Sequence, residues 1–116
     1  MREKTFERQV RLFLTDDCKC WVLKTWSNGV QREGVPDLLV CCNGFFVGVE
    51  IKAERGKPSS LQEREIKKIR ESYGIGIVLY PDQFDDFKEL INKLIEGLHY
   101  GAWCDQKNFD REKKQK

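Results

Sequence analysis

Several features that mark disulfide-rich, zinc-binding or membrane-spanning proteins are missing from this sequence. Five cysteines occur among 116 residues, but their number is odd and no two of them form a Cys-x-x-Cys pair, which argues against a disulfide framework. No apolar run approaches the roughly 20 residues that cross a bilayer. We therefore expect free thiols, no contact with a membrane and a reducing, cytoplasmic location.

Histidine is represented by one residue only, which limits the metal sites that the cysteines could join. One alternative for these thiols is a zinc site, because zinc favours four sulfur and imidazole ligands. Its ligands would be Cys18, Cys20, His99 and Cys104. Buried or half-exposed free cysteines are the simpler interpretation.

An excess of one charge is also lacking, since 21 basic residues face 19 acidic ones and the formal net charge is +2. Composition alone therefore does not indicate a nucleic-acid-binding protein. The distribution of charge says more, because residues 52–70 hold seven basic and three acidic residues and residues 107–116 hold five and two. A phosphate backbone would be attracted to both segments. A solvated helix face followed by a free terminus explains the same charges.

The spacing of apolar residues predicts elements in the order α-β-β-β-α-β-α. We expect helices over residues 3–15, 59–72 and 83–98, and strands over 20–26, 37–42, 45–52 and 77–80. Turn signals at Ser27–Gly29, Asn43-Gly44 and Gly74–Gly76 separate them. Ser59 or Ser60 should cap the second helix, and Asp82 the third. The stripes expected to face the core are Phe6, Val10, Phe13 and Leu14, then Ile66, Ile69 and Tyr73, then Phe87, Leu90, Ile91, Leu94 and Leu98.

These elements predict a mixed α/β (α+β) fold with a central four-stranded sheet flanked by helices. The first three strands follow one another through short turns, which favours an antiparallel meander, and the fourth is reached by a helical crossover. The strand over 37–42 is almost continuously apolar, as expected where both faces are covered. The length suits one domain. We place it at residues 1–100, with a polar, basic tail over 101–116 in which Trp103 and Phe109 could still pack on the domain or on a second subunit.

The strand over residues 45–52 ends on a face that is unusual for a core. Alternation places Glu50 and Lys52 beside Gly48 on one face. In a hairpin that turns at Asn43-Gly44, Asp37 lies across from Glu50. The sequence therefore brings two carboxylates and one ammonium group to the same place.

Two adjacent carboxylates repel each other unless a positive charge lies between them. A divalent cation suits them, and hard oxygen ligands favour Mg²⁺ or Mn²⁺. Lys52 could then orient a water nucleophile or stabilise charge on a phosphate, which is what metal-assisted phosphodiester hydrolysis requires. The alternative is a solvated hairpin end with an ordinary Glu50–Lys52 ion pair.

These residues resemble a known nuclease signature. Pro36-Asp37, twelve intervening residues and Glu50-Ile51-Lys52 are similar to the motif of the PD-(D/E)XK superfamily. The match is closer to its VRR-NUC branch, through Gly34–Val40, the Asn43-Gly44 turn, Val49–Ala53 and Ser60-Leu61-Gln62. Over residues of about 5–95, the resemblance implies a restriction-endonuclease-like αβββαβ core and a Mg²⁺- or Mn²⁺-dependent DNA endonuclease without a small-molecule cofactor. The small stand-alone members of the branch are bacterial or phage-borne and similar in fold to Holliday-junction resolvases, which act on branched DNA as homodimers.

The resemblance also implies roles for individual residues. Asp37, Glu50 and the carbonyl of Ile51 would bind the metal, and Lys52 would assist the attacking water. Gln62 matches a glutamine on the helix after the motif, although a polar group at a helix end is the usual interpretation of such a residue. Glu7 matches an acidic position on the first helix and would be a further metal or water ligand, where the alternative is a surface glutamate. Contacts to the DNA phosphates are expected from Arg32, Arg55, Lys57, Lys67, Lys68 and Arg70.

Other functions remain open at this stage. A nuclease of this kind could instead cut ordinary duplex, ends or flaps, as restriction and repair enzymes do, because one fold supports many substrates. A DNA-binding module that does not cut, or a protein-interaction domain with a chance motif, are the alternatives outside enzymes. A homodimer would double the basic area available to DNA.

Overall fold

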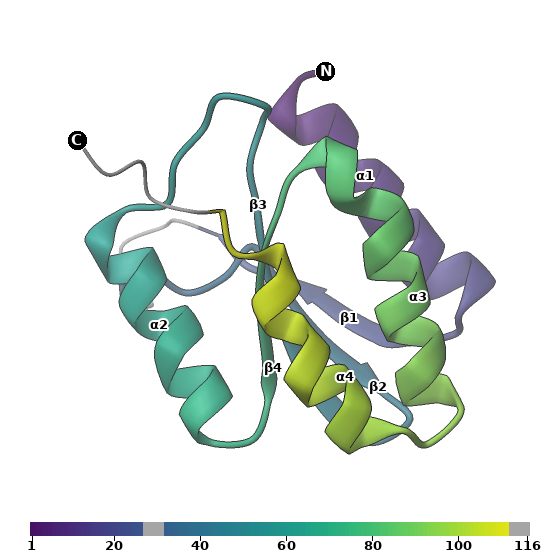
Figure 1. Ribbon diagram of the computed structural model, residues 1–116. Helices are drawn as coiled ribbons and strands as arrows, with labels where there is room; N and C mark the ends of the chain where they lie inside the picture. The colour runs from purple at the N-terminus through teal and green to yellow at the C-terminus, as the bar shows by residue number, and fades with distance from the viewer. Residues whose placement is uncertain (27–31, 112–116) are drawn as a thin grey trace.

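The computed structural model describes residues 1–26 and 32–111 (Figure 1). The Ser27–Gly29 turn and most of the basic residues at the C-terminus lie outside the described residues. The elements along the chain are α1 (Glu3–Leu12) with a π-helical extension (Phe13–Asp17), β1 (Trp21–Lys24), β2 (Leu38–Cys42), β3 (Phe45–Ile51), α2 (Ser60–Glu71), β4 (Ile75–Leu79), a 3₁₀ turn (Pro81–Gln83), α3 (Phe84–Ile95), α4 (His99–Asp105) and a second 3₁₀ turn (Gln106–Phe109).

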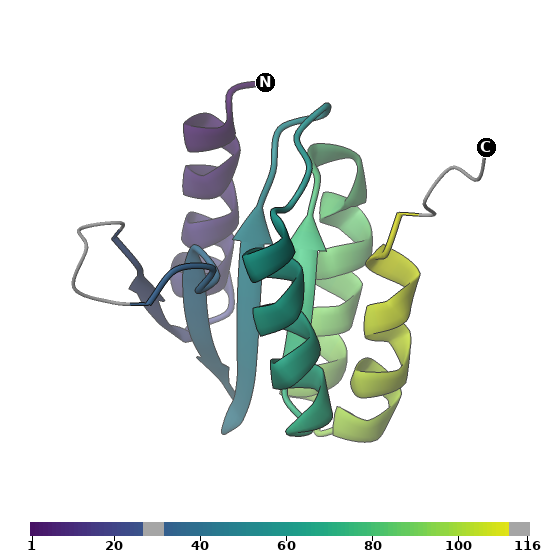
Figure 2. The same ribbon diagram turned by 90° about the vertical axis from the view of Figure 1, so that its left-hand side faces the viewer.

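The four strands form one mixed sheet in the order β1-β2-β3-β4. The first three are antiparallel and β4 runs parallel to β3, so the predicted meander and the helical crossover are both confirmed. Helices α1 and α3 lie on one side of the sheet, and α2 lies on the other side over β3 and β4 (Figure 2). This is the predicted four-stranded mixed sheet flanked by helices.

The β2–β3 hairpin has the predicted register. Cys42 pairs with Phe45 and Leu38 with Val49. Asn43 and Gly44 connect the strands at φ +52° and +85°, and such positive values at both central residues match the right-handed twist of the strands. The Asn43 side chain also donates a hydrogen bond to the carbonyl of Leu94 at 3.0 Å, which ties the turn to α3. The register matters, because a slip of one residue would move Glu50 to the opposite face.

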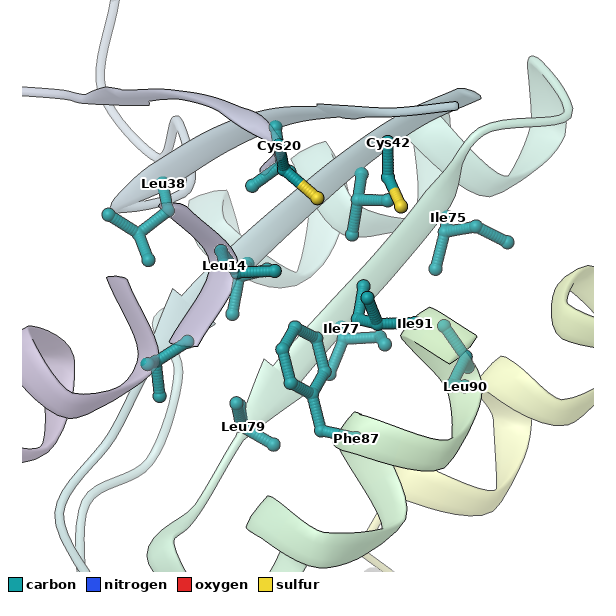
Figure 3. Close-up of a cluster of buried hydrophobic side chains, with 14 of the residues drawn as sticks. Leu14, Cys20, Leu38, Cys42, Ile75, Ile77, Leu79, Phe87, Leu90 and Ile91 are labelled. Atoms are coloured by element: carbon teal, nitrogen blue, oxygen red, sulfur yellow. The ribbon is translucent and has the colours of Figure 1, made fainter. Parts of the chain in front are cut away.

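The main core lies between the sheet and helices α1 and α3. Figure 3 shows its side chains meeting from the strands, from α3 and from the end of the first helix. The labelled members are Leu14, Cys20, Leu38, Cys42, Ile75, Ile77, Leu79, Phe87, Leu90 and Ile91, all of them buried. All five cysteines are free, as predicted. The four residues considered for zinc do not form a group that could hold a metal, and His99 stacks on Phe45 instead.

Two glycines allow α2 to approach the sheet closely. A Cβ atom on Gly48 of β3 would lie 2.7 Å from Cδ1 of Ile69, and one on Gly76 of β4 would lie 2.9 Å from the carbonyl oxygen of Ile66. Both distances are too short for real contacts, so neither position accepts a side chain without a shift of the helix. The same feature explains why β4 begins at Ile75 and not, as predicted, at Ile77. Gly76, which looks like part of a helix-breaking turn in the sequence, is here a strand residue under α2.

Some expected core positions are exposed. Tyr73 is 67% exposed because α2 ends in a Schellman motif, in which the amide of Gly74 binds the carbonyl of Ile69 at 2.9 Å and Tyr73 adopts φ +64°. Leu98 is exposed because α3 ends at Ile95 and Gly97 turns the chain at φ +82°. The predicted capping role of Asp82 is also wrong, since α3 begins after the 3₁₀ turn and its N-cap is Gln83.

The segment after α3 is more ordered than the sequence indicates. The sequence favours a polar tail from Gly101, whereas α4 and the second 3₁₀ turn cover residues up to Phe109. Ala102 and Phe109 are buried, and the Gln106 side chain accepts a hydrogen bond from the amide of Gly76 at 2.8 Å. This segment therefore packs along the β4 edge of the molecule. Within residues 1–26 and 32–111, no helix combines the length and apolarity that a membrane crossing requires.

Candidate active site

Asp37 precedes β2 and is tied to both neighbouring strands. Its Oδ2 atom accepts a hydrogen bond from the amide of Ile51 at 2.7 Å. Its carbonyl accepts one from the amide of Thr25 at 2.9 Å, and the Thr25 hydroxyl donates to the carbonyl of Pro36 at 2.8 Å. The carboxylate is thus fixed against β3 by backbone contacts. Thr25 is a contributor that the sequence analysis did not identify, because only the pairing of β1 with β2 brings it to Pro36 and Asp37.

Glu50 is the least accessible charged residue at this end of the sheet, with 2% of its surface exposed. Its Oε2 atom accepts a hydrogen bond from Nε2 of Gln62 at 3.0 Å and lies 3.3 Å from Nζ of Lys52. Its Oε1 atom is buried and has no hydrogen-bond partner among the described residues. Burial first, and then the negative charge of Asp37, raise the pKa of Glu50 to about 8, although Lys52 opposes the shift. The protein alone therefore leaves this carboxylate short of positive charge.

Gln62 links the first turn of α2 to Glu50. Its Oε1 atom accepts a hydrogen bond from the amide of Ser59 at 2.8 Å, and its own amide donates to Oγ of Ser59 at 3.2 Å. This is a capping box, in which each residue satisfies a free amide of the other. Because Oε1 is engaged with Ser59, the NH₂ end of the side chain faces Glu50. The Ser-x-x-Gln spacing could have revealed this contact in the sequence.

Lys52 follows β3 and lies on the same face as Glu50, as alternation predicts. Its amide donates to the carbonyl of Leu79 at 3.0 Å, which continues the parallel pairing with β4. Its side chain is only 13% exposed and reaches back to Glu50. The structure therefore brings together the carboxylate of Glu50, the ammonium group of Lys52 and the side-chain amide of Gln62, all of which the sequence indicates as site residues.

Glu7 lies on the other face of the sheet from Glu50. It is buried on α1 and lies 3.4 Å from Nζ of Lys24 and 3.7 Å from Nε of Arg11. Lys24 pairs with Leu38 on the sheet, so it lies on the face that α1 covers, while Glu50 faces α2. Among the described residues, no three histidine, cysteine or acidic side chains form a group that could hold a metal. Lys24 is the partner that the sequence reasoning did not identify.

The basic residues expected to meet DNA fall into two groups. Arg55, Lys57, Lys67 and Lys68 are exposed on the loop after β3 and on α2. Arg70 and Arg32 are engaged within the protein. Arg70 binds both carboxylate oxygens of Asp110, at 2.7 and 2.8 Å, and the carbonyl of Gly76 at 2.9 Å. Arg32 is exposed but forms an ion pair with the buried Glu65 at 2.7 Å.

The oxygen atoms at this site suit a hard divalent cation. Asp37 and Glu50 contribute carboxylates of opposite strands, and Ile51 lies between Glu50 and Lys52 with its carbonyl at the strand end. Among residues 1–26 and 32–111, the buried Oε1 atom of Glu50 lacks a hydrogen-bond partner. This observation fits such a cation best, because an unpaired buried charge is costly. Lys52 and Gln62 complete the site on the side of α2.

Comparison with known proteins gives one result. A family model described as archaeal Holliday junction resolvase (hjc) matches residues 1–73. No curated protein and no solved structure matches the chain significantly. The matched part contains Asp37, Glu50, Lys52 and Gln62, and ends within two residues of the end of α2. The mixed sheet flanked by helices is compatible with the restriction-endonuclease-like core of such enzymes. This chain belongs to the archaeal Holliday junction resolvase family, a family of nucleases that act on DNA.

Proposed function

We propose that this chain is a divalent-metal-dependent endonuclease that cleaves Holliday junctions and related branched DNA as a homodimer. The observation that carries the proposal is the pair of carboxylates at the start of β2 and the end of β3. In the part of the chain that the structure describes, one oxygen of the buried Glu50 has no hydrogen-bond partner and lies beside the charge of Asp37. Membership of the resolvase family supports the choice of substrate. The residues shared with the VRR-NUC branch lead us to propose that the chain is related to that branch too.

In this proposal Asp37, Glu50 and the carbonyl of Ile51 hold Mg²⁺ or Mn²⁺. The cation supplies Lewis-acid stabilisation of the charge that develops on the phosphate during hydrolysis. Glu7, which is engaged with Lys24 and Arg11, lies outside this ligand set. Its role is to hold α1 against β1 next to the site.

Lys52 and Gln62 have different tasks. The ammonium group of Lys52 stabilises charge on the phosphate and orients the attacking water. Gln62 donates a hydrogen bond to Oε2 of Glu50 and so directs the Oε1 atom of the carboxylate into the site. The capping box with Ser59 keeps the Gln62 amide in one orientation.

The residues that we propose for contacts with the DNA phosphates are Arg55, Lys57, Lys67 and Lys68. Arg32 is included because its side chain stays largely exposed despite its ion pair with Glu65. Such contacts give affinity and salt dependence without base specificity. Arg70 is better assigned to the protein itself, because its guanidinium is bound on two sides by Asp110 and Gly76.

The homodimer is proposed from the face of the sheet that α2 leaves open. Figure 2 shows β1 and β2 lying beyond the cover of α2. The side chains on this face are apolar, with Trp21 61%, Leu23 48% and Phe46 45% exposed, and Cys41 between them. A groove of about 540 Å³ continues the face toward Ile69 and Tyr73 of the α2 region. An exposed apolar patch of this kind favours association, and a second copy would bring a second active site to the same junction.

The experiment that tests the function compares cleavage of a labelled four-way junction with that of a linear duplex of the same sequence. Each is incubated with the protein and Mg²⁺ or Mn²⁺, and with EDTA in place of the metal. Cleavage of the junction alone, only with metal, is the expected result. Equal cleavage of both substrates would contradict the junction preference and leave a nuclease of the restriction or repair type. Absence of cleavage by the folded protein would contradict the nuclease and favour a DNA-binding module.

A further inference from the structure

A short turn over residues 53–56 directly follows Lys52, and a distant part of the chain holds it in place. The amide of Gly56 donates to the carbonyl of Ala53 at 2.9 Å and closes the turn. A Cβ atom on Gly56 would lie 3.3 Å from Cδ of Lys52. The backbone at Gly56 is therefore the surface along which the aliphatic part of Lys52 runs toward Glu50.

The side chain of Tyr80, the residue after β4, holds this turn through a hydrogen bond. Its hydroxyl donates a hydrogen bond to the carbonyl of Gly56 at 2.8 Å, and only 4% of the surface of the residue is exposed. The backbone around Tyr80 is itself fixed, because its amide donates to Oε1 of Gln83 at 3.2 Å and Nε2 of Gln83 donates to the carbonyl of Phe109 at 3.0 Å. A buried ring with a fixed backbone has little freedom to move away from Gly56.

Arg111 covers the other side of the Tyr80 ring. Its guanidinium carbon lies 3.4 Å from the ring centroid. One nitrogen donates to the carbonyl of Glu54 at 3.3 Å, and another to Oδ1 of Asp82 at 3.1 Å. The same side chain thus contacts the turn directly and through Tyr80, and it comes from beyond the segment that the family model matches.

We propose that Tyr80 is a positioning residue for Lys52 and that Arg111 assists it by fixing the turn over residues 53–56. Tyr80 does not contact the reacting atoms; it holds Gly56, and Gly56 supports the Lys52 side chain. The inference rests on the proposed function for its effect on cleavage. Its structural part, the placement of Lys52, is independent of that function.

Tyr80→Phe is the main test, because it removes one hydroxyl and retains the ring under Arg111. We expect the single-turnover cleavage rate of a four-way junction to fall by about tenfold or more, since small misplacements of a catalytic group are costly. The dissociation constant for the junction and the Mg²⁺ concentration that gives the half-maximal rate should stay unchanged. Tyr100→Phe, at an exposed tyrosine on α4, is the matched control and should retain the wild-type rate.

The Lys52→Ala background separates positioning from a general disturbance. If Tyr80 acts through Lys52, then adding Tyr80→Phe to Lys52→Ala should cause no further loss of rate, because the two changes remove the same interaction. The proposal would be overturned if the loss of cleavage rate in the double variant equalled the product of the two single losses. It would also be overturned if Tyr80→Phe alone cut at the wild-type rate. Arg111→Gln, a change at an exposed residue, should lower the rate in the same direction and replaces Tyr80→Phe if that variant does not fold.

A measurement without activity distinguishes failure of this inference from failure of the proposed function. A wild-type protein that does not cut the junction refutes the function. NMR of the Lys52 ε-methylene group then decides the placement. In the wild type, its two protons should have separate shifts because the side chain is held, and in Tyr80→Phe the shifts should merge. Identical Lys52 signals in both proteins would overturn the inference.

Discussion

The side-chain Nε2 atom of Gln62 donates a hydrogen bond to Oε2 of Glu50 at 3.0 Å, while Oε1 of the same side chain accepts one from the backbone amide of Ser59. One side chain therefore caps α2 and orients a carboxylate of the site. These two tasks can be separated by mutation. Ser59→Ala removes the hydroxyl of the capping box but leaves the side chain of Gln62 bound to Glu50. Gln62→Ala removes the side-chain contacts with both Ser59 and Glu50.

We expect both changes to destabilise the protein by about 1 kcal/mol, the usual cost of a lost N-cap. Only Gln62→Ala should also lower the cleavage rate, by about tenfold. Thermal unfolding and single-turnover cleavage of the junction measure the two effects. Equal cleavage rates in the two variants would show that Gln62 acts as a helix cap alone.

Metal binding should depend on Asp37 and Glu50. A ligand that binds only the folded state stabilises it, by about 2.7 kcal/mol at a concentration one hundred times its dissociation constant. Mg²⁺ or Mn²⁺ should therefore raise the unfolding temperature of the wild type. Asp37→Asn should abolish both this rise and cleavage, while Asp110→Asn, which removes an ion pair with Arg70 and none of the proposed ligands, should leave the rise intact. A variant of Asp37 that cuts at the wild-type rate would refute the assignment.

Lys52→Ala should separate chemistry from metal binding. Without its ammonium group we expect cleavage to slow by about 10²- to 10⁴-fold, as for other losses of a charge-stabilising or proton-transferring group. The metal-dependent rise in unfolding temperature should persist, because Lys52 is not a proposed ligand. Lys57→Ala serves as the control, since this exposed residue should affect DNA affinity and not the rate at saturating protein.

Glu50 should make the metal-free protein less stable as the pH rises. Its pKa is about 8 in the folded state against an ordinary value of 4.5, so between these values the folded protein holds a proton that the unfolded chain releases. Stability conferred by this proton is complete below pH 4.5, and it is lost as the pH rises toward 8. The loss amounts to several kcal/mol at about 1.4 kcal/mol per unit.

Denaturant unfolding in EDTA across this pH range measures the effect. Glu50→Gln removes the titrating group and should flatten the pH dependence while making the protein more stable near pH 8. Ordinary pH dependence in Glu50→Gln, equal to that of the wild type, would mean that another group titrates. Glu63→Gln, on the first turn of α2, is a suitable acidic control.

The open face of the sheet should mediate self-association. Leu23→Glu places a charge in the centre of the apolar face, and we expect it to shift the protein from dimer to monomer in sedimentation experiments. In this variant the rate of junction cleavage should fall by a larger factor than the affinity for a short duplex. Ile95→Glu, at an exposed apolar residue at the end of α3, should leave the dimer intact. A wild type that sediments as a monomer at micromolar concentration would contradict the dimer.

The parts of the fold that follow from local patterns could be predicted from the sequence. The Asn43-Gly44 turn sets the register, so the position of Asp37 opposite Glu50 followed directly. The position of Glu7 did not follow, because its neighbours Lys24 and Arg11 come from the packing of α1 on β1, which periodicity does not describe. Tyr73 was misplaced since its spacing fits the buried stripe, and the Schellman motif that exposes it depends on the left-handed conformation of that one residue.

Contacts between distant segments were the least predictable. Arg70 has the appearance of a phosphate-binding residue in the sequence, and only the fold brings Asp110 to it over an interval of 40 residues. Phe109 and Gln106 lie in a segment whose charges indicate a tail, yet both are buried. Each of these contacts depends on the position of β4 in the sheet, and the sequence predicts the start of this strand two residues too late.

The segment matched by the family model ends at residue 73, before β4 begins. All proposed catalytic side chains therefore precede, along the chain, the strand that pairs in parallel with β3 and about half of the buried core residues. A nascent chain that has reached residue 73 carries Asp37, Glu50, Lys52 and Gln62 but lacks the carbonyl of Leu79 and the ring of Tyr80. The matched segment by itself would therefore leave the amide of Lys52 without its partner on β4 and the carbonyl of Gly56 without the Tyr80 hydroxyl.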